Sequence, residues 1–167
     1  MQSIRLVVVS PLKVVVLSSG RVLLTRKFVD GMSLYKELWK GPITLVCERA
    51  VQAGDNLDNI EVDLDRAPFR LLPLNLQDDS LRDVLAPDSL VLAAVQFARC
   101  SRLTREAGLP CVYVSEYSLR TRLQIVRESR SSWLRKAWRS CHELRAEAAQ
   151  QKALSRAEGV QCNGVPT

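Results

Sequence analysis

The side chains best suited to chemistry follow an apolar run of the sequence at residues 111–115. Glu116 and Tyr117 come directly after this run, and Arg120 and Arg122 stand a few residues further on. A carboxylate in such a position can act as a general base or bind a hydroxyl group, and an arginine can hold a phosphate or carboxylate through paired hydrogen bonds. These four residues therefore predict a polar ligand site.

Asn163 and Gly164 form a second candidate group, directly after another apolar run, 160–162. They can present backbone amides to a ligand, but Asn-Gly is first of all a turn signal, and the turn is the favoured interpretation. The first group also has a simpler alternative, in which Glu116 caps a helix that starts near Ser118 and the arginines are solvated. Each group therefore has two interpretations: it forms a ligand site, or it has only a local structural role.

Short strand patterns alternate with helical patterns along the chain, which predicts an α/β domain of Rossmann-like, three-layer type with a mostly parallel sheet. A hairpin is expected near the N-terminus and long helices near the C-terminus. Ligands bind at the carboxyl ends of parallel strands, so Glu116 and Asn163 are expected at one edge of the sheet, on neighbouring strands. The expected strands are 4–9, 14–17, 22–24, 43–47, 69–72, 90–95, 111–115 and 160–162.

Caps and periodicity predict the helices. Asp30 caps a short helix over 33–38 that Gly41 ends, a second helix covers 80–85, and a third runs from about 97 to Gly108. The final third is helical from Ser118 until Gly159. One long helix there carries a stripe at spacings of three and four that is expected to pack on the core, formed by Leu134, Ala137, Cys141, Leu144 and Ala148.

The positive charge of the chain is concentrated in this helical third. The formal net charge is +6, but residues 118–156 hold ten Lys or Arg against three Glu, a net +7. Trp133 and Trp138 lie among these bases. Three partners fit such a segment: a second domain, an anionic membrane surface, or nucleic acid. The favoured interpretation is a packed helix with a solvated basic face, and nucleic acid is not favoured.

Several other chemistries have no support in the sequence. The five cysteines are scattered without a Cys-x-x-Cys pair, and His142 is the only histidine, so no metal site or disulfide framework is predicted. His142 is expected to be an ordinary surface residue. Glycine-rich phosphate loops and the G-x-S-x-G motif are absent. No apolar run is long enough to span a membrane, and Pro11 and Lys13 interrupt the apolar start where a signal peptide would be continuous, so a cytoplasmic protein is expected.

Two stretches of the chain resemble a known family. The segments AGLPCVYVSEYSLRTRLQIV (107–126) and ALSRAEGVQCNGVPT (153–167) resemble the N-terminal domain of bacterial glycosyltransferases with two facing Rossmann-like domains, the GT-B fold, and within it the retaining family four. The resemblance rests on the turn of Glu116, Tyr117 and Ser118 after a strand, on the basic helices, and on the step from Ala157 to Gly164.

The resemblance implies the acceptor-side half of an enzyme of polysaccharide biosynthesis. Residues 1–167 would be one domain, cut before the donor-binding domain that holds the nucleotide sugar and the family's paired glutamates. Catalytic residues are therefore unassigned here, and no cofactor or metal is expected on this domain. The expected partners are a glycan or lipid-linked acceptor, the second domain, and the cytoplasmic face of the membrane through the basic helices. The implied acceptor-binding residues are Glu116, Tyr117, Arg120, Arg122, Asn163 and Gly164. The alternative is a non-catalytic module that binds an acidic partner or nucleic acid.

Overall fold

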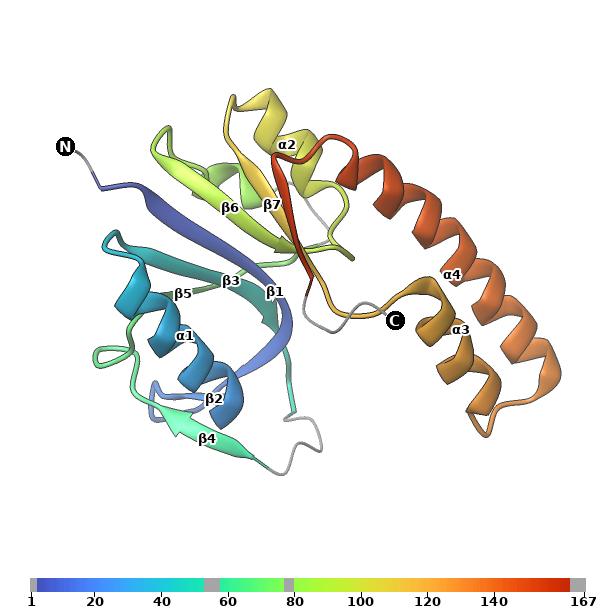
Figure 1. The fold of residues 1–167 in the computed structure, drawn as a ribbon. Helices are drawn as coiled ribbons and strands as arrows, with labels where there is room; N and C mark the ends of the chain where they lie inside the picture. The colour runs from blue at the N-terminus through green and yellow to red at the C-terminus, as the bar shows by residue number, and fades with distance from the viewer. Residues whose placement is uncertain (1–2, 53–57, 77–79, 163–167) are drawn as a thin grey trace.

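A parallel sheet of six strands forms the centre of the molecule (Figure 1). The computed structural model describes residues 3–52, 58–76 and 80–162. Numbered by their order along the chain, the parallel strands lie in the order 3-2-1-4-5-6, which is that of the dinucleotide-binding Rossmann fold. The mostly parallel sheet predicted from the sequence is confirmed. Across the sheet the strands are β5 (Arg70–Pro73), β3 (Ile43–Arg49), β1 (Arg5–Val16), β6 (Ser89–Ala94), β7 (Cys111–Ser115) and β8 (Gly159–Cys162).

The first strand belongs to two sheets. The sequence predicts separate strands at 4–9 and 14–17, but β1 runs through both. Its last residues pair antiparallel with β2 (Val22–Thr25), which confirms the predicted hairpin, and Gly20 turns the chain with a φ of +81°. β2 in turn pairs with β4 (Asn59–Val62). β4 lies within residues 50–68, where the sequence pattern predicts no strand.

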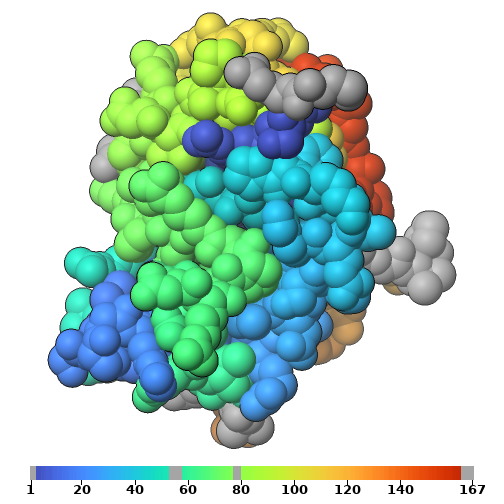
Figure 2. Space-filling view, turned by 90° about the vertical axis from the view of Figure 1, so that its left-hand side faces the viewer, coloured from blue at the N-terminus to red at the C-terminus, as the bar shows by residue number. Residues whose placement is uncertain are grey.

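Helical segments cover both faces of the sheet and make it the middle of three layers, as predicted. α1 (Arg26–Leu38) packs with Val8 and Leu45 on one face. On the other face, η1 (Ser80–Val84), α2 (Cys100–Glu106) and the end of α4 (Trp133–Leu154) pack with Val7 and Val46. In Figure 2, α1 (light blue) lies beside the green segment that follows β4. Phe28 and Phe69 join these two, with ring centroids 6.4 Å apart.

The ends of α1 differ from the prediction. The helix starts at Arg26, where the Thr25 hydroxyl accepts a hydrogen bond from the amide of Phe28, so Thr25 and not Asp30 is the cap. It ends at Leu38, before Gly41. A Cβ on Gly41 would lie 1.9 Å from the carbonyl oxygen of Ile4. The glycine is therefore required by the close approach of two chain segments, and it does not cap the helix.

The other predicted helices agree better with the structure. The residues predicted as a helix at 80–85 form the 3-10 helix η1. α2 is shorter than expected, but Gly108 has a φ of +67°, in agreement with the predicted stop. Ser118 caps α3 (Leu119–Glu128) by accepting a hydrogen bond from the Thr121 amide at 3.2 Å. Asn163 and Gly164 lie outside the described residues.

The predicted burial of the stripe on α4 is wrong. Its five members, Leu134, Ala137, Cys141, Leu144 and Ala148, are all exposed. α4 returns the chain from the end of β7 to the start of β8, but its 22 residues extend about 33 Å, whereas a five-residue strand extends about 17 Å. The N-terminal half of α4 therefore overhangs the sheet and packs on α3 (Figure 1). The helix ends at Leu154, and Gly159 already begins β8.

Candidate ligand-binding site

A cleft opens at the point where β1 stops pairing with β6, after Val9 and Ala93. Val9 pairs with both Val46 and Ala93, but the next pair between β1 and β3 is Lys13 with Glu48. The three residues between, Ser10 to Leu12, form an irregularity that Pro11 favours because it has no N–H to give to the ladder. On the other side of β1, the pairing with β6 ends at Val9, so the irregularity lies beside the switch point between the first and fourth parallel strands, where open α/β sheets bind their ligands.

The cleft has a volume of about 340 Å³, which falls at the small end of the range for small-molecule sites. Its floor is the end of the sheet, and its walls come from the start of α3 and the inner face of α4. The lining consists of Pro11, Ala94, Val95, Gln96, Val114, Glu116, Tyr117, Arg122, His142, Glu143, Ala146 and Gln150. Carboxylate, phenol, imidazole and amide groups thus meet in one hollow.

The structure brings together three of the four residues in the first predicted group. Glu116, Tyr117 and Arg122 line the cleft, and Glu116 and Tyr117 are exposed to solvent. Arg120 lines a separate hollow with Leu123 and Arg127 on another side of α3. The second group cannot be placed, but β7 and β8 are parallel neighbours, with Ser115 opposite Cys162. The strands that precede Glu116 and Asn163 therefore end at the same edge, as predicted.

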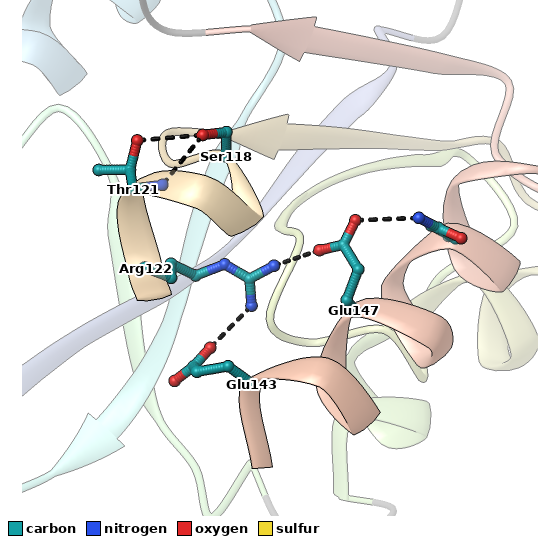
Figure 3. A network of polar contacts seen from close by, with 6 residues as sticks. Ser118, Thr121, Arg122, Glu143 and Glu147 are labelled. Carbon is teal, nitrogen blue, oxygen red and sulfur yellow. Dashed lines mark hydrogen bonds and ion pairs between the residues drawn. The ribbon is translucent and has the colours of Figure 1, made fainter. Parts of the chain in front are cut away.

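Arg122 joins α3 to α4 by binding two glutamates (Figure 3). Its Nη1 donates to Glu143 at 2.9 Å, and its Nη2 donates to Glu147. Glu147 also accepts a hydrogen bond from Gln151 at 3.1 Å. The side chains of Arg122 and both glutamates are only 17% and 24% exposed. A phosphate bound here would compete with these two carboxylates for Arg122. The principal role of Arg122 in the structure is therefore to position the cleft wall.

His142, which the sequence predicts to be an ordinary surface residue, lines the cleft. It is an exposed residue, as predicted, and its ring stacks on Trp138 with centroids 5.9 Å apart. His142, Glu143, Ala146 and Gln150 all line the cleft and share the inner side of α4. Their helical spacing of one, three and four residues was the available signal. The apolar stripe on the other side of α4 is the more prominent pattern in the sequence, and it predicts the wrong inner face.

A second, more apolar groove adjoins the cleft. It lies between the irregularity of β1 and α1, has a volume of about 520 Å³, and shares Pro11 and Glu116 with the cleft. Its apolar lining includes Leu12, Phe28, Met32 and Tyr35. Glu116 therefore stands between the cleft and a more apolar groove.

Titratable groups beneath the site are structural. Burial raises the pKa of Cys47 and of Cys100 to about 12 and the pKa of Cys111 to about 11. Desolvation is the main cause in each case. The buried Tyr113 hydroxyl accepts a hydrogen bond from the Ser101 amide at 2.8 Å and donates to the Ala98 carbonyl at 2.9 Å. Across the described residues, no group of three His, Cys, Asp or Glu side chains could hold a metal ion.

The sheet order, the two helical layers and the cleft at the switch point define a Rossmann-like α/β domain. Among solved structures the chain is similar to UGT2 of Phytolacca americana. In the complex of UGT2 with UDP-2fluoro-glucose and pterostilbene, the match covers 99% of this chain and 48% of UGT2, with a TM-score of 0.54 and 11% identity. For apo UGT2 it covers 98% and 46%, with a TM-score of 0.51 and 11% identity.

The likeness shows the fold, and this chain spans about half the length of UGT2. No protein-family model and no curated protein matches the sequence. None of the helices in the described parts of the chain has the length and apolar character needed to cross a membrane.

Proposed function

We propose that the chain is the acceptor-side half of a glycosyltransferase, which moves a sugar from a nucleotide donor to a hydroxyl of a glycan or a lipid-linked glycan. The observation that carries the proposal is the cleft at the switch point of the sheet, with groups suited to hydroxyls around it. The fold supports the proposal, because 99% of this chain matches part of the structure of UGT2, and UGT2 was solved with a nucleotide sugar.

Glu116 is the residue we assign to the acceptor hydroxyl. It follows β7 directly and is exposed at the mouth of the cleft, where its carboxylate can accept a hydrogen bond or a proton from a hydroxyl. His142 and Gln150 lie on the opposite wall and offer further polar contacts. Tyr117, which is 57% exposed, supplies an aromatic face at the entrance. Together these groups fit a polyhydroxylated ligand better than a flat apolar one.

The adjoining groove supports an acceptor with an apolar part. Its lining by Leu12, Phe28 and Met32 begins where the polar cleft ends, at Pro11 and Glu116. A lipid-linked glycan could place its sugar in the cleft and the first part of its lipid in the groove, because the two hollows share a border. This is the acceptor class that we favour.

The donor is assigned to a second domain. The chain has no glycine-rich phosphate loop, and the bases nearest the cleft do not form an open anion site, because Arg122 is held by Glu143 and Glu147. A facing domain that closes on this cleft would bring donor and acceptor into line and exclude water, which competes as an acceptor. The retaining family four is the family that we propose.

The test uses the gene sequence beyond codon 167. We expect it to encode a second α/β domain, and we expect the joined protein to transfer sugar from a nucleotide donor to a lipid-linked glycan. E116Q should raise the KM for the acceptor by about tenfold or more, because a charge-assisted hydrogen bond is lost, and leave the KM for the donor unchanged. E37Q, at an exposed glutamate on α1, is the matched control. A joined protein without transferase activity, or E116Q kinetics equal to those of E37Q, contradicts the proposal.

A further inference from the structure

The overhanging half of α4 carries an apolar face that the described chain leaves uncovered. Trp133 is 73% exposed, Leu134 62%, Trp138 68% and Leu144 52%. At 100° per residue these four side chains fall within about 140° of one another around the helix, so they form one face. The small exposed residues Ala137 and Cys141 lie between them. We call these six residues the outer face of α4.

The surface around this outer face is strongly basic. Residues 118–156 hold only three glutamates, and two of them, Glu143 and Glu147, bind Arg122 on the inner side of the helix. The bases near the outer face therefore keep most of their charge toward solvent. By the same helical geometry, Arg145 lies on this side of α4 and Arg135 lies beyond its Trp138 edge, and both are exposed. Aromatic, aliphatic and cationic side chains thus share one projecting surface.

We propose that the outer face of α4 docks on an anionic lipid bilayer. Tryptophan and leucine side chains gain free energy by entering the interfacial region of a bilayer, while arginines stay at the level of the lipid phosphates. Nucleic acid would also attract the arginines and stack on the tryptophans, but it offers nothing to Leu134 and Leu144. The combination of aliphatic and basic groups therefore favours lipid. This proposal does not depend on sugar transfer.

The first test is flotation of the intact chain with lipid vesicles. The anionic vesicles contain phosphatidylcholine with 30% phosphatidylglycerol, which is roughly a physiological fraction of anionic lipid. We expect the chain to bind them at least about tenfold more strongly than vesicles of pure phosphatidylcholine. Tryptophan emission should shift to shorter wavelength on binding, because Trp133 and Trp138 leave water. Rising salt should weaken the binding, because the bases contribute to it.

Two pairs of variants separate the apolar and the charged contributions. W133S combined with W138S should weaken binding to anionic vesicles by about tenfold or more. Its thermal stability should match the parent chain, because both side chains are exposed. L38S is the matched control, since Leu38 is an 85% exposed apolar residue on α1. R135Q combined with R145Q should also weaken binding, while R105Q on α2 should not.

Three results would overturn the proposal. The first is equal binding to neutral and anionic vesicles, or no binding to either. The second is a tryptophan double variant that binds as well as L38S. The third is a shift of tryptophan emission with a single-stranded oligonucleotide but none with anionic vesicles, which would identify the outer face as a nucleic-acid surface. Loss of transferase activity with intact vesicle binding would count against the proposed function alone.

Discussion

Among the residues around the cleft, Arg122 combines deep burial with two ion pairs. It is largely buried, it binds one carboxylate with each terminal nitrogen, and its Nε is buried without a hydrogen-bond partner in the part of the chain that the structure describes. One guanidinium thus compensates two carboxylates, and the cluster carries a net negative charge beside the cleft. The arginine is therefore important both for the packing of α3 on α4 and for the electrostatics of the site.

Replacement of Arg122 should destabilise the domain. R122A leaves Glu143 and Glu147 half-buried without their partner, which we expect to lower the free energy of unfolding by about 2 kcal/mol. Chemical denaturation monitored by circular dichroism gives the value. R120A, an exposed position on the same helix, should change it little. Equal stability of the two variants would show that the Arg122 contacts contribute nothing.

The cysteines divide into two classes that a thiol reagent can count. Cys47, Cys100 and Cys111 are buried and have a raised pKa of about 11 to 12, so at pH 8 they are protonated as well as inaccessible. Cys141 and Cys162 are exposed. Titration with a chromogenic disulfide at pH 8 should therefore detect two thiols in the folded chain and five in denaturant. Rapid reaction of a third thiol would contradict the burial described here.

At the scale of elements, glycines with different surroundings give a direct comparison. G41A should destabilise the domain by roughly 1–3 kcal/mol or more, because the new Cβ meets the carbonyl of Ile4. G31A places a methyl group in open space within α1 and should stabilise the domain by about 0.5–1 kcal/mol. Thermal denaturation of the two variants measures both effects. Similar melting temperatures would mean that the chain relaxes freely at Gly41.

The sequence predicted strands better than helix faces. Strands at 43–47, 90–95 and 111–115 were found because a buried parallel strand is a continuous apolar run with turn residues at its ends. The stripe on α4 was real, but spacing indicates only that residues share a side of a helix. Which side is covered depends on the space left by η1 and α2 and on the length of α4. That information is tertiary, and for this reason His142 and Glu143 were not predicted at the cleft.

At the scale of the whole molecule, the position of the cleft was predictable and part of its lining was not. Parallel strands imply a binding edge at their carboxyl ends, and Glu116 lies there. Pro11 and Gln150 come from segments far from Glu116 in the sequence, and no local pattern links the three. The irregularity of β1, which opens the cleft, depends on how β1 pairs with both of its neighbours in the sheet, and the sequence alone does not give that pairing.

The two proposals place α4 between two partners. Its inner side lines the cleft with His142, Glu143 and Gln150, and its outer face is assigned to lipid. If both proposals hold, the cleft opens close to the bilayer surface. A lipid-linked acceptor could then reach the cleft by lateral diffusion, without leaving the membrane.

The overhang of α4 also sets the N-terminal half of this helix and α3 apart from the two core clusters of the sheet. Within the described chain, no residue between 119 and 144 belongs to either hydrophobic core cluster. Segments with few core contacts open locally at low free-energy cost, while the rest of the fold stays intact. We therefore expect the floor of the cleft, which the sheet provides, to be more rigid than its wall. A ligand that bridges the two would restrict that wall, and part of its binding free energy would be spent on the lost conformational entropy.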